Sequence, residues 1–330
     1  MCGRYALELA LEHTQYLAGV QLTEPIANYN VTPTHTVPIL VDRLFGDETL
    51  EAMPGSTASF APHASPDAAP SAPAQGRFVR EMHAARWGLL PGWAKDPSFA
   101  SRAFNARSET IFTKPTFREA AVAGHCAVPV SGYYEWKTET TAAGKTAKTP
   151  YFVHRADGRP IYFAGLYEWW KIPEEFAGPG SGFEGQGGQW LLSCSIITMD
   201  SPGNGEFDSG ILADLGGEAP YANQIEEQLG QLHNRLPIPL SVADDRNISE
   251  SDSLTFWLRS GRAAGTRKPA DAASKLHQSQ SAEAALAHLR EQAFVQTAGW
   301  AMHPVSKDVG NVSNNAPYLI EPAEDLLTGL

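Results

Sequence analysis

The cysteine that directly follows the initiator methionine has the greatest chemical potential in this sequence. Methionine aminopeptidases remove Met1 when the next residue is small, and the chain would then begin with Cys2, which carries a thiol and a free α-amine. An α-amine has a pKa of about 7.7–8.0, so a useful fraction is neutral at pH 7. A nearby cation such as Arg4, or the α-ammonium itself, lowers the pKa of a thiol below about 8.5. The pair suits an aldehyde, which the amine converts to an imine and the thiol closes to a thiazolidine. The alternative is that Cys2 is an ordinary residue.

Two other residues are suited to acid–base chemistry. Glu135 lies among three aromatic residues in Gly132–Lys137, which should desolvate its carboxylate and raise its pKa. The alternative is an exposed glutamate on an aromatic hairpin. His233 follows a helical pattern and has an ordinary pKa near the physiological range. A lone histidine is more often a structural or surface residue, so this position is open to both interpretations.

The composition is that of a soluble globular protein, with 330 residues, 42% hydrophobic and 19% charged. The cysteines at positions 2, 126 and 194 are far apart in the sequence, which argues against a disulfide framework and a thiolate zinc site. We therefore expect a cytoplasmic protein without a metal or cofactor. No run of eighteen apolar residues occurs, so no membrane partner is expected.

The net charge of −12 argues against a nucleic-acid partner, but the charges are unevenly distributed. Eight basic and three acidic residues lie between Arg77 and Arg118, so this segment carries a local charge of +5. Such asymmetry allows one basic face on an acidic protein, although a solvated surface segment would look the same. Within this segment, Trp87–Trp93 places two tryptophans among glycine and proline. This predicts a rigid aromatic turn, at a functional surface or at a corner of the core.

The apolar patterns predict short strands interrupted by helices, without the rhythm of a parallel α/β fold. Strands are predicted at Val37–Val41, Phe78–Leu89, His125–Val130, Tyr151–Val153, Ile161–Ala164 and Trp190–Thr198. Helices are predicted at Ala6–Ala18, Pro115–Ala123, Ala222–Leu232, Ser249–Leu258 and Ala282–Gln292. The dipeptide Asp157-Gly158 predicts a hairpin between the strands beside it. Segments 52–76 and 178–189 are rich in glycine and other small residues and are expected to be flexible insertions.

Seven stretches in a fixed order resemble one protein family. They are MCGRY at Met1, YNVTPT at Tyr29, RWGLLPGW at Arg86, FNARSET at Phe104, GYYEWK at Gly132, LHNRLP at Leu232 and HPVSKDVGN at His303. Together they are similar to the SRAP family, the SOS response-associated peptidases now understood as abasic-site processing proteins. The resemblance implies a single domain over residues 2–322, followed by a tail at 323–330. It also implies an α+β fold of strongly bent, mainly antiparallel sheets that form a pseudo-barrel with helices outside.

The resemblance further implies a covalent reaction with damaged DNA. SRAP proteins bind single-stranded DNA that carries an abasic site, including at replication-fork junctions, and form a thiazolidine through the N-terminal cysteine. Carried over by motif, Cys2 is the nucleophile, Asn105 positions the reacting end, Glu135 acts near the amine and sugar, and His233 assists sugar-ring opening and protonation. The implied DNA contacts are Arg4, Asn30, Pro33, Trp93, Arg107 and Thr198. The resemblance also implies self-removal of Met1 and a monomer that associates with the nucleoid when bound to DNA, and it leaves a lyase activity open.

Some features depart from the family pattern. Segments 52–76 and 178–189 are long for the family, as is the stretch between Thr198 and His233, and Leu236 stands where Met or Arg is common. These departures put the details of DNA contact in doubt but remove no implied catalytic residue. Two alternatives remain open. One is a cysteine peptidase or N-terminal-nucleophile hydrolase acting in trans, and the other is a non-covalent nucleic-acid-binding module.

Overall fold

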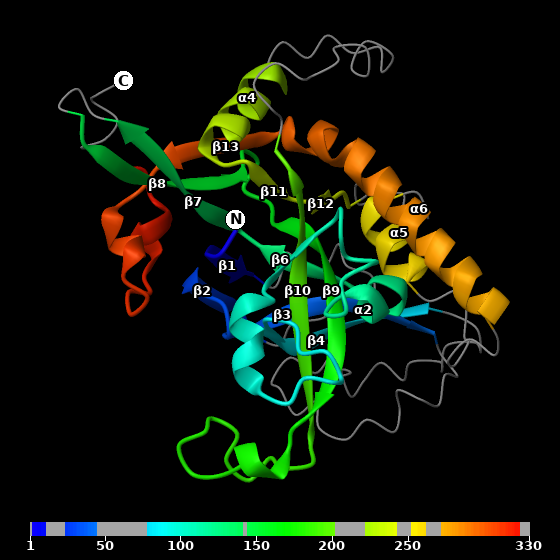
Figure 1. Cartoon of the computed structure of the whole chain (residues 1–330). Helices are drawn as coiled ribbons and strands as arrows, with labels where there is room; N and C mark the ends of the chain where they lie inside the picture. Colours follow the sequence, from blue (N-terminus) through cyan, green and yellow to red (C-terminus); the bar gives the residue numbers. More distant parts are fainter. Residues whose placement is uncertain are drawn as a thin grey trace, which may run out of the picture.

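The computed structural model of the protein describes residues 2–10, 24–44, 78–140, 144–201, 222–242, 252–261 and 272–323. The strands are β1 (Tyr5–Leu9), β2 (Ile26–Val31), β3 (Thr36–Leu44), β4 (Phe78–Trp87), β5 (Asn105–Arg107), β6 (His125–Val130), β7 (Gly132–Thr140), β8 (Thr146–Arg155), β9 (Ile161–Lys171), β10 (Trp190–Asp200), β11 (Arg235–Pro237), β12 (Pro239–Leu240) and β13 (Trp300–Pro304). The α-helices are α2 (Arg118–Ala123), α4 (Ala222–Leu232), α5 (Ser253–Ser260) and α6 (Ala272–Thr297). Short 3-10 helices are η2 (Pro97–Arg102), η3 (Glu174–Phe176), η4 (Lys307–Gly310) and η5 (Pro317–Ile320). The predicted α+β class is confirmed (Figure 1).

Five strands close into a barrel. Antiparallel pairings run from β10 to β9, from β9 to β6, from β6 to β3 and from β3 to β4. A parallel pairing between β4 and β10 completes the ring. A closed ring with an odd number of strands cannot be antiparallel throughout, so at least one parallel pair is a geometric necessity. The predicted pseudo-barrel of mainly antiparallel strands is therefore confirmed.

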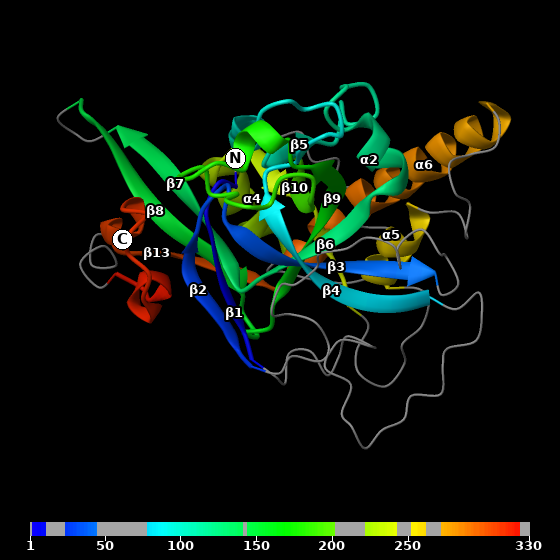
Figure 2. The ribbon, with the colours of Figure 1, turned by 90° about the horizontal axis from the view of Figure 1, so that it is seen from below.

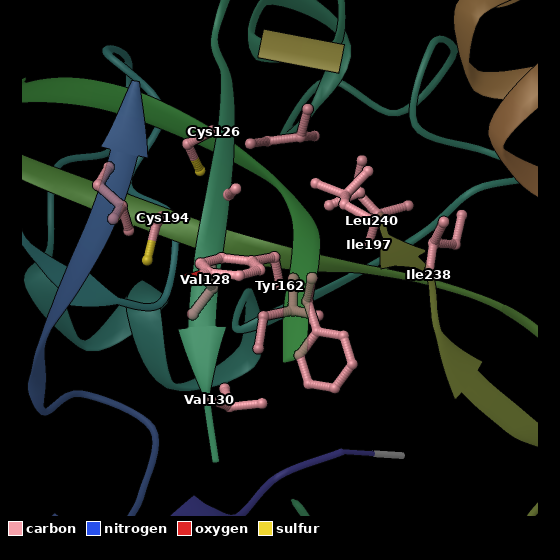
Figure 3. Close-up of a cluster of buried hydrophobic side chains, with 14 of the residues drawn as sticks. Cys126, Val128, Val130, Tyr162, Cys194, Ile197, Ile238 and Leu240 are labelled. Carbon is pink, nitrogen blue, oxygen red and sulfur yellow. The ribbon is translucent and has the colours of Figure 1, made fainter. Parts of the chain in front are cut away.

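Two strands of the barrel, β6 and β10, are mostly apolar because both of their faces are covered. Every residue of β6 is buried, and β10 is buried from Leu192 to Met199. Figure 3 shows the side chains of Cys126 and Val128 on β6 in one cluster with Cys194 on β10. Strands that are buried on both faces are expected to have nearly continuous apolar runs rather than alternating ones. This explains why the sequence pattern located β6 and β10 well.

A second sheet has the order β13-β8-β7-β1-β2 and lies beside the barrel (Figure 2). The hairpin predicted around Asp157-Gly158 is wrong, because β8 belongs to this sheet and β9 to the barrel. The dipeptide does make a turn, and Gly158 adopts a positive φ of 73°. However, β8 already has β7 and β13 as neighbours, and β9 has β6 and β10. Both edges of each strand are thus occupied, so the two cannot pair.

The helix predicted at Ala6–Ala18 is wrong at its start, where the chain forms β1. This strand pairs with β2 on one side and with β7 on the other. Tyr5, Leu7 and Leu9 are buried and Glu8 is exposed. The apolar spacing fits either structure over so short a length, and the two neighbouring strands supply the backbone hydrogen bonds that decide between them. Residues 11–18 of the predicted helix lie outside the described part of the chain.

Helices cover one side of the barrel. α5 packs on β3 and β6, and the long α6 packs on α5, α2 and β12 (Figure 1). Trp257 of α5 donates a hydrogen bond from Nε1 to the carbonyl of Cys126 at 3.0 Å, and its ring stacks on His125 with centroids 3.6 Å apart. Asp252 caps α5 by accepting a hydrogen bond from the amide of Thr255. No helix in the described ranges is long and apolar enough to cross a membrane.

The glycine-rich segment 178–189 forms part of the connection between β9 and β10. Phe183 within it has an exposed fraction of only 6% and packs with Trp170 and Ile172 in a small apolar cluster. The segment is therefore anchored by one aromatic side chain, and its flexibility stays a prediction. Segment 52–76, the other predicted insertion, lies outside the described residues.

Candidate functional site

Cys2 lies just before β1 and is fully buried, with an exposed fraction of 0%. Asn105, the first residue of β5, donates a hydrogen bond from Nδ2 to the carbonyl oxygen of Cys2 at 2.7 Å. Burial raises the pKa of the Cys2 thiol well above its usual value, and the negative charge of Glu135 raises it further. In the chain that still carries Met1, the expectation that this pKa is lowered is wrong, because burial and Glu135 outweigh the N-terminal ammonium and the hydrogen bond from the Arg4 backbone, which both lower it. Burial beside Glu135 thus favours the neutral thiol.

The pairing of β1 with β7 brings Glu135 to Cys2. The amide of Tyr134 donates to the carbonyl of Arg4 at 2.9 Å, which joins the two segments one residue before Glu135. The exposed fraction of Glu135 is 5%, so the alternative of an exposed glutamate on an aromatic hairpin is wrong. Its charge acts on both the Cys2 thiol and the His233 imidazole. A nucleophile, a carboxylate and an imidazole therefore share one site.

His233 directly follows α4 and is half-buried. Its Nδ1 accepts a hydrogen bond from the backbone N–H of Arg235 at 2.9 Å. In a neutral imidazole with Nδ1 as acceptor, the proton resides on Nε2, which is then a donor. Burial lowers the pKa of His233, and the charge of Glu135 opposes this shift. The ring is therefore held in the tautomer that has Nε2 as its donor nitrogen.

Two of the residues predicted to contact DNA are exposed. Trp93 has an exposed fraction of 54%, donates from Nε1 to the carbonyl of Pro115 at 3.3 Å, and meets the ring of Phe99 edge-on. The alternative that the tryptophan turn is a corner of the core therefore fits Trp87, which is 0% exposed, but not Trp93. Arg107 ends β5, two residues beyond Asn105, and is also exposed.

Arg4 and Asn30 bind the C-terminal part of the chain. The Arg4 guanidinium donates to Oδ1 of Asn30 at 3.0 Å and lies over the ring of Trp136, 5.6 Å from its centroid. Asn30 is 1% exposed, and its Nδ2 donates to the carbonyls of Asn311 at 3.0 Å and Asn314 at 2.8 Å. The amide group of Asn30 thus holds a loop, and a direct contact of Asn30 with DNA stays a prediction.

Pro33 and Thr198, the other two residues predicted to contact DNA, differ in exposure. Pro33 is partly exposed in the turn between β2 and β3. Thr198 is 0% exposed and pairs with Arg107 across the parallel β5–β10 ladder. Its carbonyl accepts hydrogen bonds from the Ser108 amide at 2.9 Å and from Arg235 at 2.6 Å. The structure therefore places Thr198 beneath the site as a support, and its predicted role in DNA contact is untested.

Comparison with known protein families shows to which family the chain belongs. The sequence model of the family described as SOS response associated peptidase (SRAP) matches residues 1–207. The chain belongs to the SRAP family. In the ranges that the structure describes, no group of three or more His, Cys, Asp or Glu side chains is placed to hold a metal ion.

Relatives of this SRAP protein carry related names. "Abasic site processing protein YoqW" of Bacillus subtilis is 37% identical over 113 residues, which are 34% of this chain and 43% of that protein. The match thus spans less than half of this relative. "Abasic site processing protein YedK" of Escherichia coli is 25% identical over 98% of this chain and 100% of its own length. A solved structure from Bacteroides thetaiotaomicron has a TM-score of 0.56 at 18% identity and covers 98% of this chain and 100% of that one, which supports the fold.

Arg235 is a buried member of this SRAP site that the sequence analysis did not single out. Its guanidinium forms a two-pronged ion pair with Glu109, with distances of 3.1 and 3.0 Å, and also contacts Asp200 and Thr198. Hydrogen bonds to Arg235 lower the pKa of Glu109 despite the opposing effect of burial. The network joins β10, β11 and the turn after β5, and thereby braces the backbone that orients His233. The sequence feature that could have pointed to Arg235 is its place two residues after His233, directly before an apolar run.

Proposed function

We propose that this protein processes abasic sites in DNA, and that it does so by binding single-stranded DNA and forming a covalent thiazolidine between Cys2 and the opened sugar. The names of its relatives support the role in abasic-site processing. The observation that carries the finer proposal is the convergence of Cys2, Asn105, Glu135 and His233 in one site. Removal of Met1, which frees the α-amine, is part of the proposal.

The chemistry begins with the closed sugar of the abasic site, a cyclic hemiacetal. Opening the ring takes a proton from the hydroxyl on C1′ and returns one to the ring oxygen, which gives the free aldehyde. His233 suits the second transfer because its Nε2 carries a proton in the neutral tautomer. Glu135 suits the first transfer as a buried carboxylate beside it. General acid–base help of this kind is typically worth about 10²–10⁴-fold in rate.

The proposed order of the two attacks on C1′ starts with the α-amine. Its attack on the aldehyde needs no thiolate, and burial beside Glu135 disfavours a thiolate at Cys2. Loss of water then gives an imine. The sulfur next adds to C1′, and the thiol proton passes to the imine nitrogen, a transfer that the nearby carboxylate of Glu135 could relay. Aldehyde and aminothiol thus yield thiazolidine and one water. The hydrogen bond from Asn105 to the Cys2 carbonyl fixes the reacting end throughout.

The raised pKa also weighs against the alternative of a peptidase acting in trans. Cysteine peptidases attack through a thiolate, which nearby positive charge stabilises. Cys2 instead lies beside a carboxylate and is fully buried. A thiol in this setting is a weak nucleophile towards an amide, whereas an amine-first reaction does not need a thiolate. The exposed Trp93 and Arg107 also support a nucleic-acid substrate, through base stacking and phosphate contact.

Denaturing gel electrophoresis with an abasic single-stranded oligonucleotide tests the proposal. The processed wild type should form a heat-stable adduct. A form with an N-terminal tag keeps the thiol but lacks the free amine, and should form none. Cys2→Ser and Cys2→Ala should form at best an imine that needs borohydride trapping. Cys126→Ala is the matched control, since it removes another buried thiol and should keep the stable adduct. A stable adduct from the tagged form would contradict the N-terminal mechanism.

A further inference from the structure

Two arginines and a histidine lie beside the turn between β2 and β3, and both ring nitrogens of the histidine contact Thr32. They are Arg4, His35 and Arg86, called the His35 cluster below. The carbonyl of His35 accepts from the amide of Trp87 at 2.9 Å, and the amide of Thr34 donates to the carbonyl of Trp87 at 2.7 Å. These bonds fasten the turn to the end of β4, so that His35 lies next to Arg86. Both Arg4 and Arg86 lower the pKa of His35 in addition to its burial.

The His35 cluster has no negative partner within the described ranges. Neither Arg4 nor Arg86 forms an ion pair with a described carboxylate, and the Nε atoms of both are buried without a hydrogen-bond partner there. Burial lowers the pKa of both guanidinium groups. Burying cationic groups without an anion is unfavourable. A cluster of this kind is therefore suited to an anion that comes from outside the chain.

The glycine-rich segment gives Arg86 a fixed position. The Arg86 guanidinium lies over the ring of Phe183, 5.5 Å from its centroid, and Phe183 is itself anchored in an apolar cluster. A planar guanidinium that stacks on an aromatic face can bind a planar or tetrahedral oxyanion through its edge. Segment 178–189, which is long for the family, thus has a physical link to the His35 cluster.

We propose that the His35 cluster, with Arg86 and His35 as its new members, binds one internal phosphodiester of the DNA strand. The proposal rests on the proposed function, which supplies the DNA. The cluster shares Arg4 with the segment that carries Cys2, so the bound phosphate lies near the abasic sugar. Phe183 acts as a positioning residue, because it touches Arg86 and not the DNA. The ligand is recognised by charge and shape, without reading a base.

The test uses a fluorescent single-stranded oligonucleotide with a tetrahydrofuran abasic analogue, which cannot open to an aldehyde and therefore reports equilibrium binding alone. Arg86→Met should weaken binding by about tenfold, the effect of one charge-assisted contact. It should also reduce the log–log salt slope by about 0.7. His35→Gln and Phe183→Leu should weaken binding less. Arg290→Met, on the exposed surface of α6, is the matched loss of charge and should bind like the wild type.

A scan with neutral methylphosphonate linkages identifies the contact. One linkage should weaken binding of the wild type but add nothing to the defect of Arg86→Met. If every linkage weakens both proteins equally, or if Arg86→Met binds like the wild type, the proposal is overturned. A melting temperature of Arg86→Met close to that of the wild type separates lost contact from lost folding, and a large drop would assign Arg86 a structural role instead. If the wild type itself neither binds nor cross-links abasic DNA, the proposed function fails, which is a distinct result.

Discussion

Arginines on two sides of the barrel have opposite surroundings. Under α5, Arg80 and Arg259 both pair with Asp42, at 2.7 and 3.1 Å, and Arg80 also donates to Thr255. The Asp42 side chain is only 2% exposed. Around Cys2, by contrast, the arginines of the His35 cluster have no ion pair with a described residue. The positive charges of the first group are neutralised within the fold. Those of the second group are suited to pair with a negatively charged ligand.

The histidines show the same contrast. His125, in the barrel wall, stacks on Trp257, and its two ring nitrogens lie 3.1 and 2.8 Å from the carbonyls of Trp257 and Ala121. His233 has Nδ1 bound to the backbone and its other nitrogen directed to chemistry in the proposed mechanism. Both ring nitrogens of His125 are thus bound within the barrel wall, whereas the proposed mechanism uses Nε2 of His233 as a proton donor. This difference, more than residue type, separates the wall from the site.

The largest expected effect concerns the chemistry of the site. Glu135→Gln and His233→Ala should each slow single-turnover cross-linking by about 10²–10⁴-fold, because each removes a proton-transfer group. Affinity for the tetrahydrofuran oligonucleotide should stay within about twofold, because neither residue is assigned to a phosphate. Rapid-quench sampling on denaturing gels measures the rate. Unchanged rates in both variants would remove these residues from the mechanism.

The barrel wall should respond to acid through His125. Burial lowers the pKa of His125 from 6.5 to about 4. Above pH 6.5 the imidazole is neutral in both the folded and unfolded states and has no effect. As the pH falls from about 6.5 to about 4, only the unfolded state gains the proton, so stability decreases by about 3 kcal/mol in total. Urea denaturation across this window should show the slope.

His125→Gln is the control for the acid experiment. His35, His233 and His303 also have lowered pKa values, each mainly through burial, and contribute a slope of the same sign. The difference between the wild type and His125→Gln therefore isolates the effect of the wall. Parallel curves for the two proteins would show that His125 is protonated as readily in the fold as in the unfolded chain.

The two groups of arginines should separate stability from binding. Arg80→Met leaves the buried Asp42 with one partner, and should lower the free energy of unfolding by about 3 kcal/mol without changing the salt slope of DNA binding. Arg107→Met changes an exposed arginine outside both groups that is predicted to contact DNA, and should instead leave the melting temperature unchanged and reduce the salt slope by about 0.7. Thermal denaturation and fluorescence anisotropy measure both. A common response of the two variants would abolish the distinction between an arginine paired within the fold and one that contacts DNA.

The sequence singled out residues that the structure brings together, but it did not predict their surroundings. Local motifs identified Cys2, Glu135 and His233, but the raised pKa of Cys2 depends on burial and on a carboxylate 133 positions away, which no local pattern contains. Two strands of the barrel, β6 and β10, were found because they are mostly apolar and buried over nearly their whole length. The pairing of β8 and β9 was predicted wrongly. A turn at Asp157-Gly158 can be recognised locally, but the strands that pair with β8 and β9 lie elsewhere in the sequence. Arg235 was missed because its role lies in partners distant in sequence.

The smallest expected effect tests whether the turn beside the site is strained. Thr34 has a positive φ of 77°, the only described residue other than glycine with such an angle. A β-branched residue is disfavoured there by about 1–2 kcal/mol, and its backbone is held by the hydrogen bond to Trp87. Thr34→Gly removes that strain but makes the unfolded chain more flexible, so the net gain in unfolding free energy should be about 0.5 kcal/mol. Urea denaturation measures this gain, with Thr36→Gly in β3 as a control that should only destabilise.

Because the same turn carries His35, the glycine should also loosen the phosphate subsite and weaken binding of the tetrahydrofuran oligonucleotide by about twofold, in line with the small energy of the turn. A loss of stability in Thr34→Gly would show that the turn is not strained by Thr34.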